Sequence, residues 1–163
     1  MKIGILSDTH DNLSNLIAVL EALRESGINT LIHCGDLTNP ELIYRFKGFR
    51  LIYTFGNIDY STGAIQKQVQ KIGKDNFAGM VFRGTIGGVP LAATHSHIEG
   101  QVMALVREKR SRWIFHGHTH RKRDEVIHGT RVINPGALGG LYRDHRSYCI
   151  VDLDTEDVKF IEI

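Results

Sequence analysis

Short apolar runs alternate with helical patterns over the first third of the chain. Three of these runs predict buried strands: Lys2–Leu6, Thr30–Cys34 and Leu51–Phe55. From Leu13 to Leu23, apolar residues recur every three or four positions, which predicts an amphipathic helix that ends at Gly27. Asn39 before Pro40 is typical of a second helix N-terminus, with the Asn side chain as its cap. The order βαβαβ favours a parallel sheet covered by helices.

In the second half, apolar runs flank turns that contain glycine, a pattern typical of antiparallel hairpins. Gly87–Gly88 separates one pair of runs and His128–Gly129 separates another. We expect hairpin strands at Met80–Phe82, Val89–Ala93, Glu125–Ile127 and Arg131–Ile133, further strands at Trp113–Phe115, Tyr148–Val151 and Val158–Ile161, and a helix at Gln101–Lys109. Ser61–Asn76 and Leu138–Arg146 are interpreted as loops. Because no repeat or linker interrupts this pattern, we expect one α/β domain over residues 1–163.

Composition and charge exclude several classes of protein. The chain has 163 residues, 42% of them hydrophobic and 23% charged, which excludes a disordered or fibrous protein. A net charge of +2 is too small to make the whole protein a nucleic-acid or membrane binder. No apolar run approaches the ~18 residues of a membrane helix, and Asp8 interrupts the first run too early for a secretory signal. Cys34 and Cys149 have apolar neighbours, so we expect buried thiols in a reducing cytoplasm, not a disulfide.

Polar residues that can bind metals follow five of the predicted strands, at the point where each strand ends. They are Asp8 and His10, Asp36, Asn57 and Asp59, His95 and His97, and His118 and His120. In open α/β sheets, ligands bind outside the carboxyl ends of the strands. These side chains are therefore expected to converge on one crevice.

The types of these residues indicate a metal site. Asp, Asn and neutral His offer oxygen and nitrogen donors without a thiolate, a set that suits Mn, Fe or Zn. Seven side chains are candidate ligands: Asp8, His10, Asp36, Asn57, His95, His118 and His120. Seven are too many for one tetrahedral site, but they suffice for two ions about 3.5–4 Å apart that share a carboxylate.

The complete set of motifs resembles the calcineurin-like metallophosphoesterase superfamily. The matching segments are Asp8-x-His10, Gly35-Asp36, Gly56-Asn57-x-Asp59, His95 and Gly117-His118-x-His120, and the late Asn134-Pro135-Gly136 resembles the small YfcE-like branch. The resemblance implies a four-layer α/β-β/α sandwich that hydrolyses a phosphodiester or phosphomonoester with metal-activated hydroxide. It also implies two divalent ions, Mn²⁺ first, with Fe, Zn, Ni, Co and Mg as alternatives, and a homodimer or homotetramer.

The resemblance further implies a role for each site residue. One ion takes Asp8, His10 and His120, the other takes Asn57, His95 and His118, and Asp36 bridges both. The candidate catalytic residues are Asn57, Asp59 and His97. Asp59 orients a ligand or donates a proton, or it only stabilises its own turn. His97 contacts the substrate phosphate or supports His95, or it is a solvated loop residue.

Two positions depart from the family pattern. Many family phosphatases have a histidine, taken as the general acid, where this chain has Ile58, which cannot transfer a proton. Glycine commonly follows the fourth-strand ligand, where this chain has Ser96. The first departure concerns protonation of the leaving group, and the second concerns the geometry of the loop.

The remaining histidines are assigned to the core or to the surface. His33 and His116 lie within apolar strands, so we expect them to be buried with their hydrogen bonds satisfied. His128 lies in a hairpin turn and His145 in a basic loop, where exposure is expected.

The basic segment 107–123 has seven basic residues and one acidic residue. Because it contains His118 and His120, its charge is interpreted as steering an anionic phosphoester, or as a solvated helix end and turn. Only Trp113 supplies an aromatic ring there, so neither nucleic acid nor membrane is expected as the main partner. Two alternatives to a hydrolase are a non-catalytic interaction scaffold on the same fold, like the retromer subunit, and a redox di-metal protein. The filled ligand positions argue against the first, and the scarcity of carboxylates argues against the second.

Overall fold

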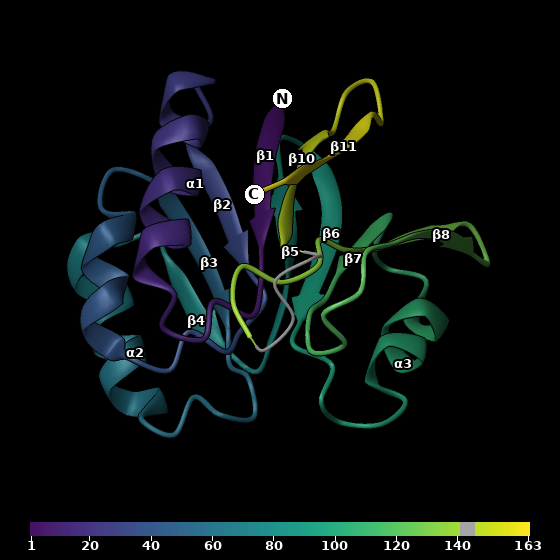
Figure 1. Ribbon diagram of the computed structural model, residues 1–163. Helices are drawn as coiled ribbons and strands as arrows, with labels where there is room; N and C mark the ends of the chain where they lie inside the picture. The colour runs from purple at the N-terminus through teal and green to yellow at the C-terminus, as the bar shows by residue number, and fades with distance from the viewer. Residues whose placement is uncertain (141–145) are drawn as a thin grey trace.

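Two β-sheets pack face to face, with helices on their outer faces, in the computed structural model, which describes residues 1–140 and 146–163 (Figure 1). The first sheet has the order β11-β10-β1-β2-β3-β4 and the second β5-β6-β7-β9-β8. The first sheet contains β1 Lys2–Leu6, β2 Thr30–His33, β3 Arg50–Thr54, β4 Phe77–Gly79, β10 Ser147–Asp152 and β11 Val158–Glu162. The second contains β5 Val81–Ile86, β6 Val89–Thr94, β7 Trp113–Phe115, β8 Arg123–Ile127 and β9 Thr130–Asn134. Strands β1 to β4 are parallel to one another, as are β6, β7 and β9.

Helices form the two outer layers. They are α1 Leu13–Glu25, the 3₁₀ helix η1 Pro40–Phe46, α2 Thr62–Ile72 and α3 Gln101–Glu108. Helix α1 begins after Asn12, whose side chain accepts a hydrogen bond from the N–H of Asn15. In Figure 1, α1 and α2 flank the first sheet and α3 flanks the second. This arrangement confirms the predicted four-layer α/β-β/α fold class.

The apolar core is layered because alternate residues of a strand point to opposite faces of its sheet. Ile3 and Ile5 of β1 lie between the two sheets, where they belong to one buried cluster with Trp113 and Phe115 of β7. Leu6 belongs instead to the cluster beneath α1 and α2. Full burial of one such side chain contributes roughly 1.5–3 kcal/mol. These layers therefore fix the two sheets against each other and hold the strand ends in register.

Three expectations about the elements are corrected by the structure. The segment Ser61–Asn76 is not a loop, because α2 occupies most of it and β4 follows. The helix that starts at Pro40 is a 3₁₀ helix, although Asn39 caps it as expected. The second half is not built of antiparallel hairpins alone, because β6, β7 and β9 are parallel neighbours. Of the predicted loop Leu138–Arg146, residues 141–145 lie outside the described part of the chain.

Two further predictions about chain class are tested here. Cys34 and Cys149 are both buried free thiols, as predicted. Among residues 1–140 and 146–163, none of the helices has the length and apolar character that crossing a bilayer requires.

Candidate metal centre

The carboxyl ends of β1, β2, β3, β6 and β7 reach the lower edge of the two sheets in Figure 1. Every residue predicted for the site lies within the five residues that follow one of these strands. The loop after β1 and the loop after β7, more than a hundred positions apart in the sequence, contact each other there through His10 and His120. The predicted convergence on one edge is therefore present.

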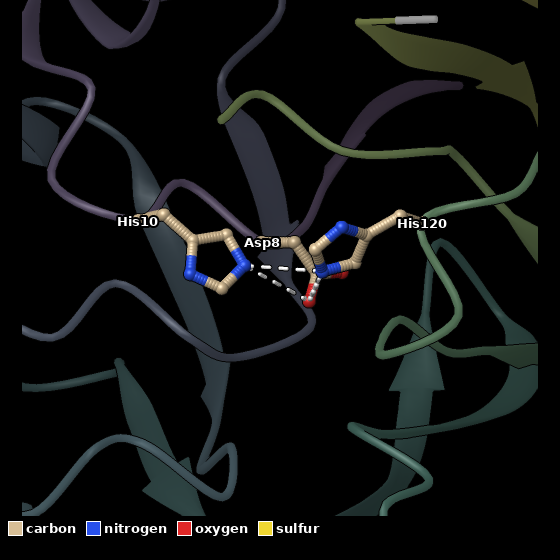
Figure 2. Close-up of side chains that lie close together, drawn as sticks. All are labelled: Asp8, His10 and His120. Carbon is tan, nitrogen blue, oxygen red and sulfur yellow. Dashed lines mark hydrogen bonds and ion pairs between the residues drawn. The ribbon is translucent and has the colours of Figure 1, made fainter. Parts of the chain in front are cut away.

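Asp8, His10 and His120 form a first cluster of metal-binding groups (Figure 2). The Nε2 atoms of His10 and His120 are 3.1 Å apart, and they lie 3.8 and 3.2 Å from Asp8 Oδ1. Figure 2 shows the two rings approaching the Asp8 carboxylate from opposite sides. Ion–ligand distances near 2.1 Å place the ligands of one ion about 3–3.5 Å apart. The three atoms are thus spaced nearly as ligands of a single ion.

Asp8, Asp36 and His95 form a second cluster next to the first. His95 Nε2 lies 3.2 Å from Asp36 Oδ2, 3.1 Å from Asn57 Oδ1 and 4.0 Å from Asp8 Oδ1. Asp8 Oδ1 therefore lies within reach of both clusters. The bridging role of Asp36 stays a prediction, because the carboxylate that the two clusters share in this structure is that of Asp8.

The Asp8 carboxylate shows whether these residues fit a cation. Its side chain is fully buried, and Oδ2 accepts hydrogen bonds from the Ser7 hydroxyl and from the His118 backbone N–H. Oδ1 has no hydrogen-bond partner among the described residues. A buried charged oxygen without a partner is costly unless a cation or a donor compensates it. The orphaned Oδ1, facing three imidazole nitrogens, fits a divalent cation.

The tautomer of His95 also suits metal binding. Its Nδ1–H donates to the backbone carbonyl of Cys34 over 2.6 Å. The neutral ring therefore keeps a lone pair on Nε2, which faces Asp36 and Asn57. Metal-binding histidines are typically held by such a bond on the opposite nitrogen.

Five of the seven predicted ligands have left-handed backbone conformations. Their φ angles are 53° at Asp8, 46° at His10, 59° at Asp36, 70° at His118 and 57° at His120. This conformation costs roughly 1–2 kcal/mol for most residues, although Asp and His tolerate it better. Backbone strain of this kind concentrates at functional sites, where surrounding contacts maintain it. The turns after β1, β2 and β7 thus carry their predicted ligands on left-handed backbone.

Charge coupling inside the clusters shifts three pKa values. The carboxylate of Asp8, 3.2 Å from His120 Nε2, raises the pKa of His120 above its ordinary value, although burial opposes the shift. For His95, burial lowers the pKa, but the hydrogen bond to Asp36 and the charge of Asp8 outweigh it, so the pKa is raised. The Asp36 pKa is lowered, because the hydrogen bond with His95 outweighs burial. The histidines and carboxylates of the two clusters are thus electrostatically coupled.

His118 and His97 lie at the exposed side of the second cluster. The His118 ring is exposed, and its centroid lies 5.1 Å from that of His95 and 6.4 Å from that of His97. His118 belongs to neither close cluster. His97 has its Nδ1 atom buried without a hydrogen-bond partner among the described residues, and burial, followed by the charge of His95, lowers its pKa.

Asp59 is buried and acts as an acceptor. Its carboxylate accepts hydrogen bonds from the backbone N–H groups of Asp36, Thr38 and Gly56 and from the Tyr53 hydroxyl. The bond from Gly56 closes the turn that contains Asp59, and those from Asp36 and Thr38 tie it to the loop after β2, so both the orienting role and the turn-stabilising role stay open. Proton donation by Asp59 stays a prediction.

Two small residues allow the loops to approach each other. A Cβ atom on Gly117 would lie 1.8 Å from Ser7 Oγ and 2.8 Å from Asp8 Oδ2, so only glycine fits there. Ser96 adopts φ 73°, a conformation that favours the glycine found in the family. Its hydroxyl lies 3.2 Å from His116 Nδ1 and 3.3 Å from the Gly117 carbonyl. The serine therefore keeps the turn and links it to the loop after β7.

Asn134 has a structural role that residue types alone did not indicate. The buried amide donates to the Gly117 carbonyl over 2.9 Å and to the Thr119 hydroxyl over 3.1 Å. Its Oδ1 accepts from the Gly136 N–H. Asn134 thus fixes the loop that carries His118 and His120, and the only sequence signal for it is the Asn-Pro-Gly motif.

The remaining histidines follow the prediction with one exception. His33 is fully buried with both ring nitrogens hydrogen-bonded, and His128 is exposed in its turn. His116 is buried, but its Nε2 has no hydrogen-bond partner among the described residues. His145 lies outside the described residues.

The basic segment does not surround the site as expected. The backbone of Arg112 bonds to Pro90 at the start of β6 and to Arg131 at the start of β9. Residues 107–112 therefore lie at the amino ends of these strands, opposite the metal-binding edge. Arg112 also forms an ion pair with Glu156. Only the basic residues 121–123, directly after His120, remain near the site.

Comparisons with known proteins agree with this geometry. A model of the calcineurin-like phosphoesterase superfamily domain matches residues 1–156. The chain is 30% identical over 165 residues to phosphodiesterase MJ0936 of Methanocaldococcus jannaschii, with 100% of this chain and 98% of the relative covered. A solved structure of an archaeal phosphodiesterase has a TM-score of 0.94 at 28% identity, with 100% of both chains covered. Zn²⁺-complexed Vps29 of Entamoeba histolytica shares the fold, with a TM-score of 0.70 at 16% identity over 100% of this chain and 98% of that one. The chain therefore belongs to the calcineurin-like phosphoesterase superfamily.

Proposed function

We propose that this chain is a metal-dependent phosphoesterase, a phosphodiesterase before a phosphomonoesterase, with two divalent ions held by the predicted ligands. The observation that carries the proposal is Asp8 Oδ1, a buried oxygen without a hydrogen-bond partner among the described residues, which lies 3.2–4.0 Å from three imidazole Nε2 atoms. In this proposal Mn²⁺ is the first candidate metal and a small phosphoester is the substrate. Residues 1–163 form one catalytic domain, which acts in the cytoplasm. A homodimer or homotetramer is its proposed assembly.

In this proposal the chain supplies the ligands in two groups. Asp8, His10 and His120 hold one ion, and Asn57, His95 and His118 hold the other, with Asp36 reaching both. Divalent ions supply Lewis acidity toward phosphoryl oxygens and make water a stronger nucleophile at neutral pH. The chain itself fixes the ligand tautomers and turns their donor atoms inward, as the bond from His95 to Cys34 illustrates.

His97 and Asn57 are the proposed substrate-facing groups. Asn57 is exposed, and its Oδ1 lies beside His95 Nε2 at the surface of the second cluster. Since the pKa of His97 is lowered, its ring is neutral at pH 7 and suits a hydrogen bond to phosphate better than proton donation. Ile58 has no proton to transfer, and its backbone N–H is used by Asp36 Oδ1.

The test is activity of metal-stripped protein with each divalent ion restored, over a panel of phosphodiesters and phosphomonoesters. Hydrolysis is expected to disappear with chelation and to return with Mn²⁺, and Mn²⁺ is expected to raise the melting temperature because it binds the folded state. If protein with two bound ions hydrolyses no ester in the panel, the scaffold alternative is favoured over an enzyme.

A matched pair of variants links the activity to the site. His120 and His128 both have left-handed backbones, with φ of 57° and 49°, and asparagine tolerates that conformation. His120→Asn is expected to lose the ion of the first cluster and its activity. His128→Asn, in an exposed hairpin turn, is expected to keep both. Equal activity of the two variants would contradict the proposed ligand set.

A further inference from the structure

Two aromatic residues with polar groups lie directly beneath the metal-binding loops. His33 on β2 and Tyr53 on β3 are register partners, both fully buried. Their rings stack with centroids 5.0 Å apart and planes 13° from parallel, and Phe46 packs edge-on against His33. Neither side chain belongs to the two metal-binding clusters. Their polar atoms nevertheless point into the loops that carry the ligands.

His33 connects the loop after β1 to the loop after β2. Its Nδ1 accepts the backbone N–H of Gly35 over 3.2 Å, so the proton of the neutral ring lies on Nε2. Nε2–H therefore donates to the hydroxyl of Thr9, 2.7 Å away. Thr9 separates Asp8 from His10, and Gly35 precedes Asp36. One imidazole thus fixes the residues next to three predicted ligands.

Tyr53 connects the loop after β2 to the loop after β3. Its hydroxyl accepts the backbone N–H of Leu37 over 3.1 Å and donates to Asp59 Oδ2 over 2.7 Å. The same Asp59 oxygen accepts the backbone N–H groups of Asp36 and Gly56 at 3.0 and 2.8 Å. Gly56 precedes the predicted ligand Asn57. The tyrosine hydroxyl therefore ties the backbone of Asp36 to the turn that presents Asn57.

We infer that His33 and Tyr53 are positioning residues, which hold the ligand loops in their metal-binding geometry before any ion binds. The inference rests on the proposed function. The loops need such support because Asp8, His10 and Asp36 have left-handed backbones. Conformations of this kind persist only where surrounding contacts over-determine them. A buried stack bonded to three successive loops provides that constraint from the core side.

The two residues divide their effects between the two ions. His33 holds Thr9, which lies within the first cluster, whereas Tyr53 holds Asp59 and the turn before Asn57, in the second. Loss of a group that orients a ligand commonly weakens metal binding ~10–100-fold. Tyr53→Phe, which removes one hydroxyl without changing the ring, is expected to lower the affinity for the second ion by that factor. His33→Asn can keep the acceptor for the Gly35 N–H but not the donor to Thr9, and it is expected to lower the affinity for the first ion.

Calorimetric titration of metal-stripped protein with Mn²⁺ tests the inference, with the unfolding midpoint of the metal-free protein measured alongside. Repeating Tyr53→Phe in the His120→Asn background, where the first cluster lacks a ligand, assigns the weakened ion. Tyr148→Phe is the matched control, because Tyr148 is buried and its hydroxyl makes no hydrogen bond to another described residue.

The outcomes separate this inference from the proposed function. If the wild type binds no Mn²⁺, the proposed metal site fails. If the wild type binds two ions and Tyr53→Phe weakens one of them while Tyr148→Phe weakens neither, the inference is supported. If Tyr53→Phe and His33→Asn lower only the metal-free unfolding midpoint and bind Mn²⁺ as the wild type does, the two residues are structural and the inference is overturned. Should Tyr53→Phe not fold, His33→Asn decides alone by the same comparison.

Discussion

The buried His33 predicts a specific pH dependence of stability in the metal-free protein. Burial lowers the pKa of His33 from 6.5 to about 4, although the charges of Asp59 and Asp8 oppose the shift. The ring resists protonation for a visible reason, since its Nδ1 accepts the Gly35 N–H and cannot also carry a proton. Between pH 6.5 and about 4, the unfolded chain therefore binds a proton at this position that the folded chain does not.

The sign and size of the effect follow from this difference. Stability from His33 is complete above pH 6.5 and is lost as the pH falls toward 4. Each pKa unit corresponds to about 1.4 kcal/mol, so the full loss is about 3 kcal/mol. In a chain of this size, that loss lowers the melting temperature by about 6–12 °C.

The assay is urea unfolding of metal-stripped wild type and His33→Asn at intervals from pH 8 to 4.5. The other groups with shifted pKa values, including His116 with a pKa of about 4, are present in both proteins, so the difference between the two profiles reports the removal of His33. The variant is expected to be less stable at pH 7, because it lacks the bond to Thr9. Its free energy of unfolding should fall less steeply as the pH is lowered, by the slope that uptake of about one proton produces. Parallel profiles for the two proteins would refute the assignment.

Three further predictions concern the site. Asp36→Asn removes the negative charge of a predicted ligand and is expected to lose one ion and at least ~100-fold in rate, and elemental analysis with two tightly bound ions and near-normal turnover would contradict it. Since Ile58 replaces a general acid worth ~100–10,000-fold, aryl esters are expected to be cleaved well and alkyl esters poorly. Ile58→His should raise kcat/KM for alkyl esters more than for aryl esters. If the wild-type kcat/KM does not change with the pKa of the leaving group, a proton donor is already present and the prediction is wrong. Gly117→Ala should lower the free energy of unfolding by at least ~2 kcal/mol, because its Cβ would overlap Ser7 Oγ at 1.8 Å. An unchanged urea midpoint would show that the loop shifts at little cost.

The elements that the sequence predicted are those with dense local patterns. The runs that became β1 and β2 each hold adjacent apolar residues, Ile5-Leu6 and Leu31-Ile32, and α1 carries leucines at helical spacing between Asn12 and Gly27. Helix α2 was missed because Ile65 and Val69 are its only fully buried residues, and glutamines and lysines separate them. The parallel pairing of β6, β7 and β9 could not be read locally, because it depends on strands that the chain joins through long crossovers.

The site was predictable in its residue types but not in its internal contacts. Asp, His and Asn at strand ends indicated the candidate ligands, because both their chemistry and their positions pointed to one edge. That Asp8 Oδ1, rather than Asp36, is shared by the two close clusters depends on distances between loops. Two of the bonds accepted by Asp59 come from Asp36 and Thr38, 23 and 21 positions away, so no spacing rule could show them.

The same residue types satisfy two requirements at this edge, and this explains how the fold presents so many ligands at once. Where a strand ends in a sharp left-handed turn, the residues that best tolerate that backbone after glycine are Asn, Asp and His. These are also the residues that bind Mn²⁺ or Zn²⁺. The turns at Asp8, Asp36 and His120 therefore build the backbone geometry and the ligand set with one choice of residue. This choice leaves backbone strain and an unpartnered oxygen at Asp8. In our inference the buried hydrogen bonds of His33 and Tyr53 offset the strain, and a bound cation would compensate the oxygen.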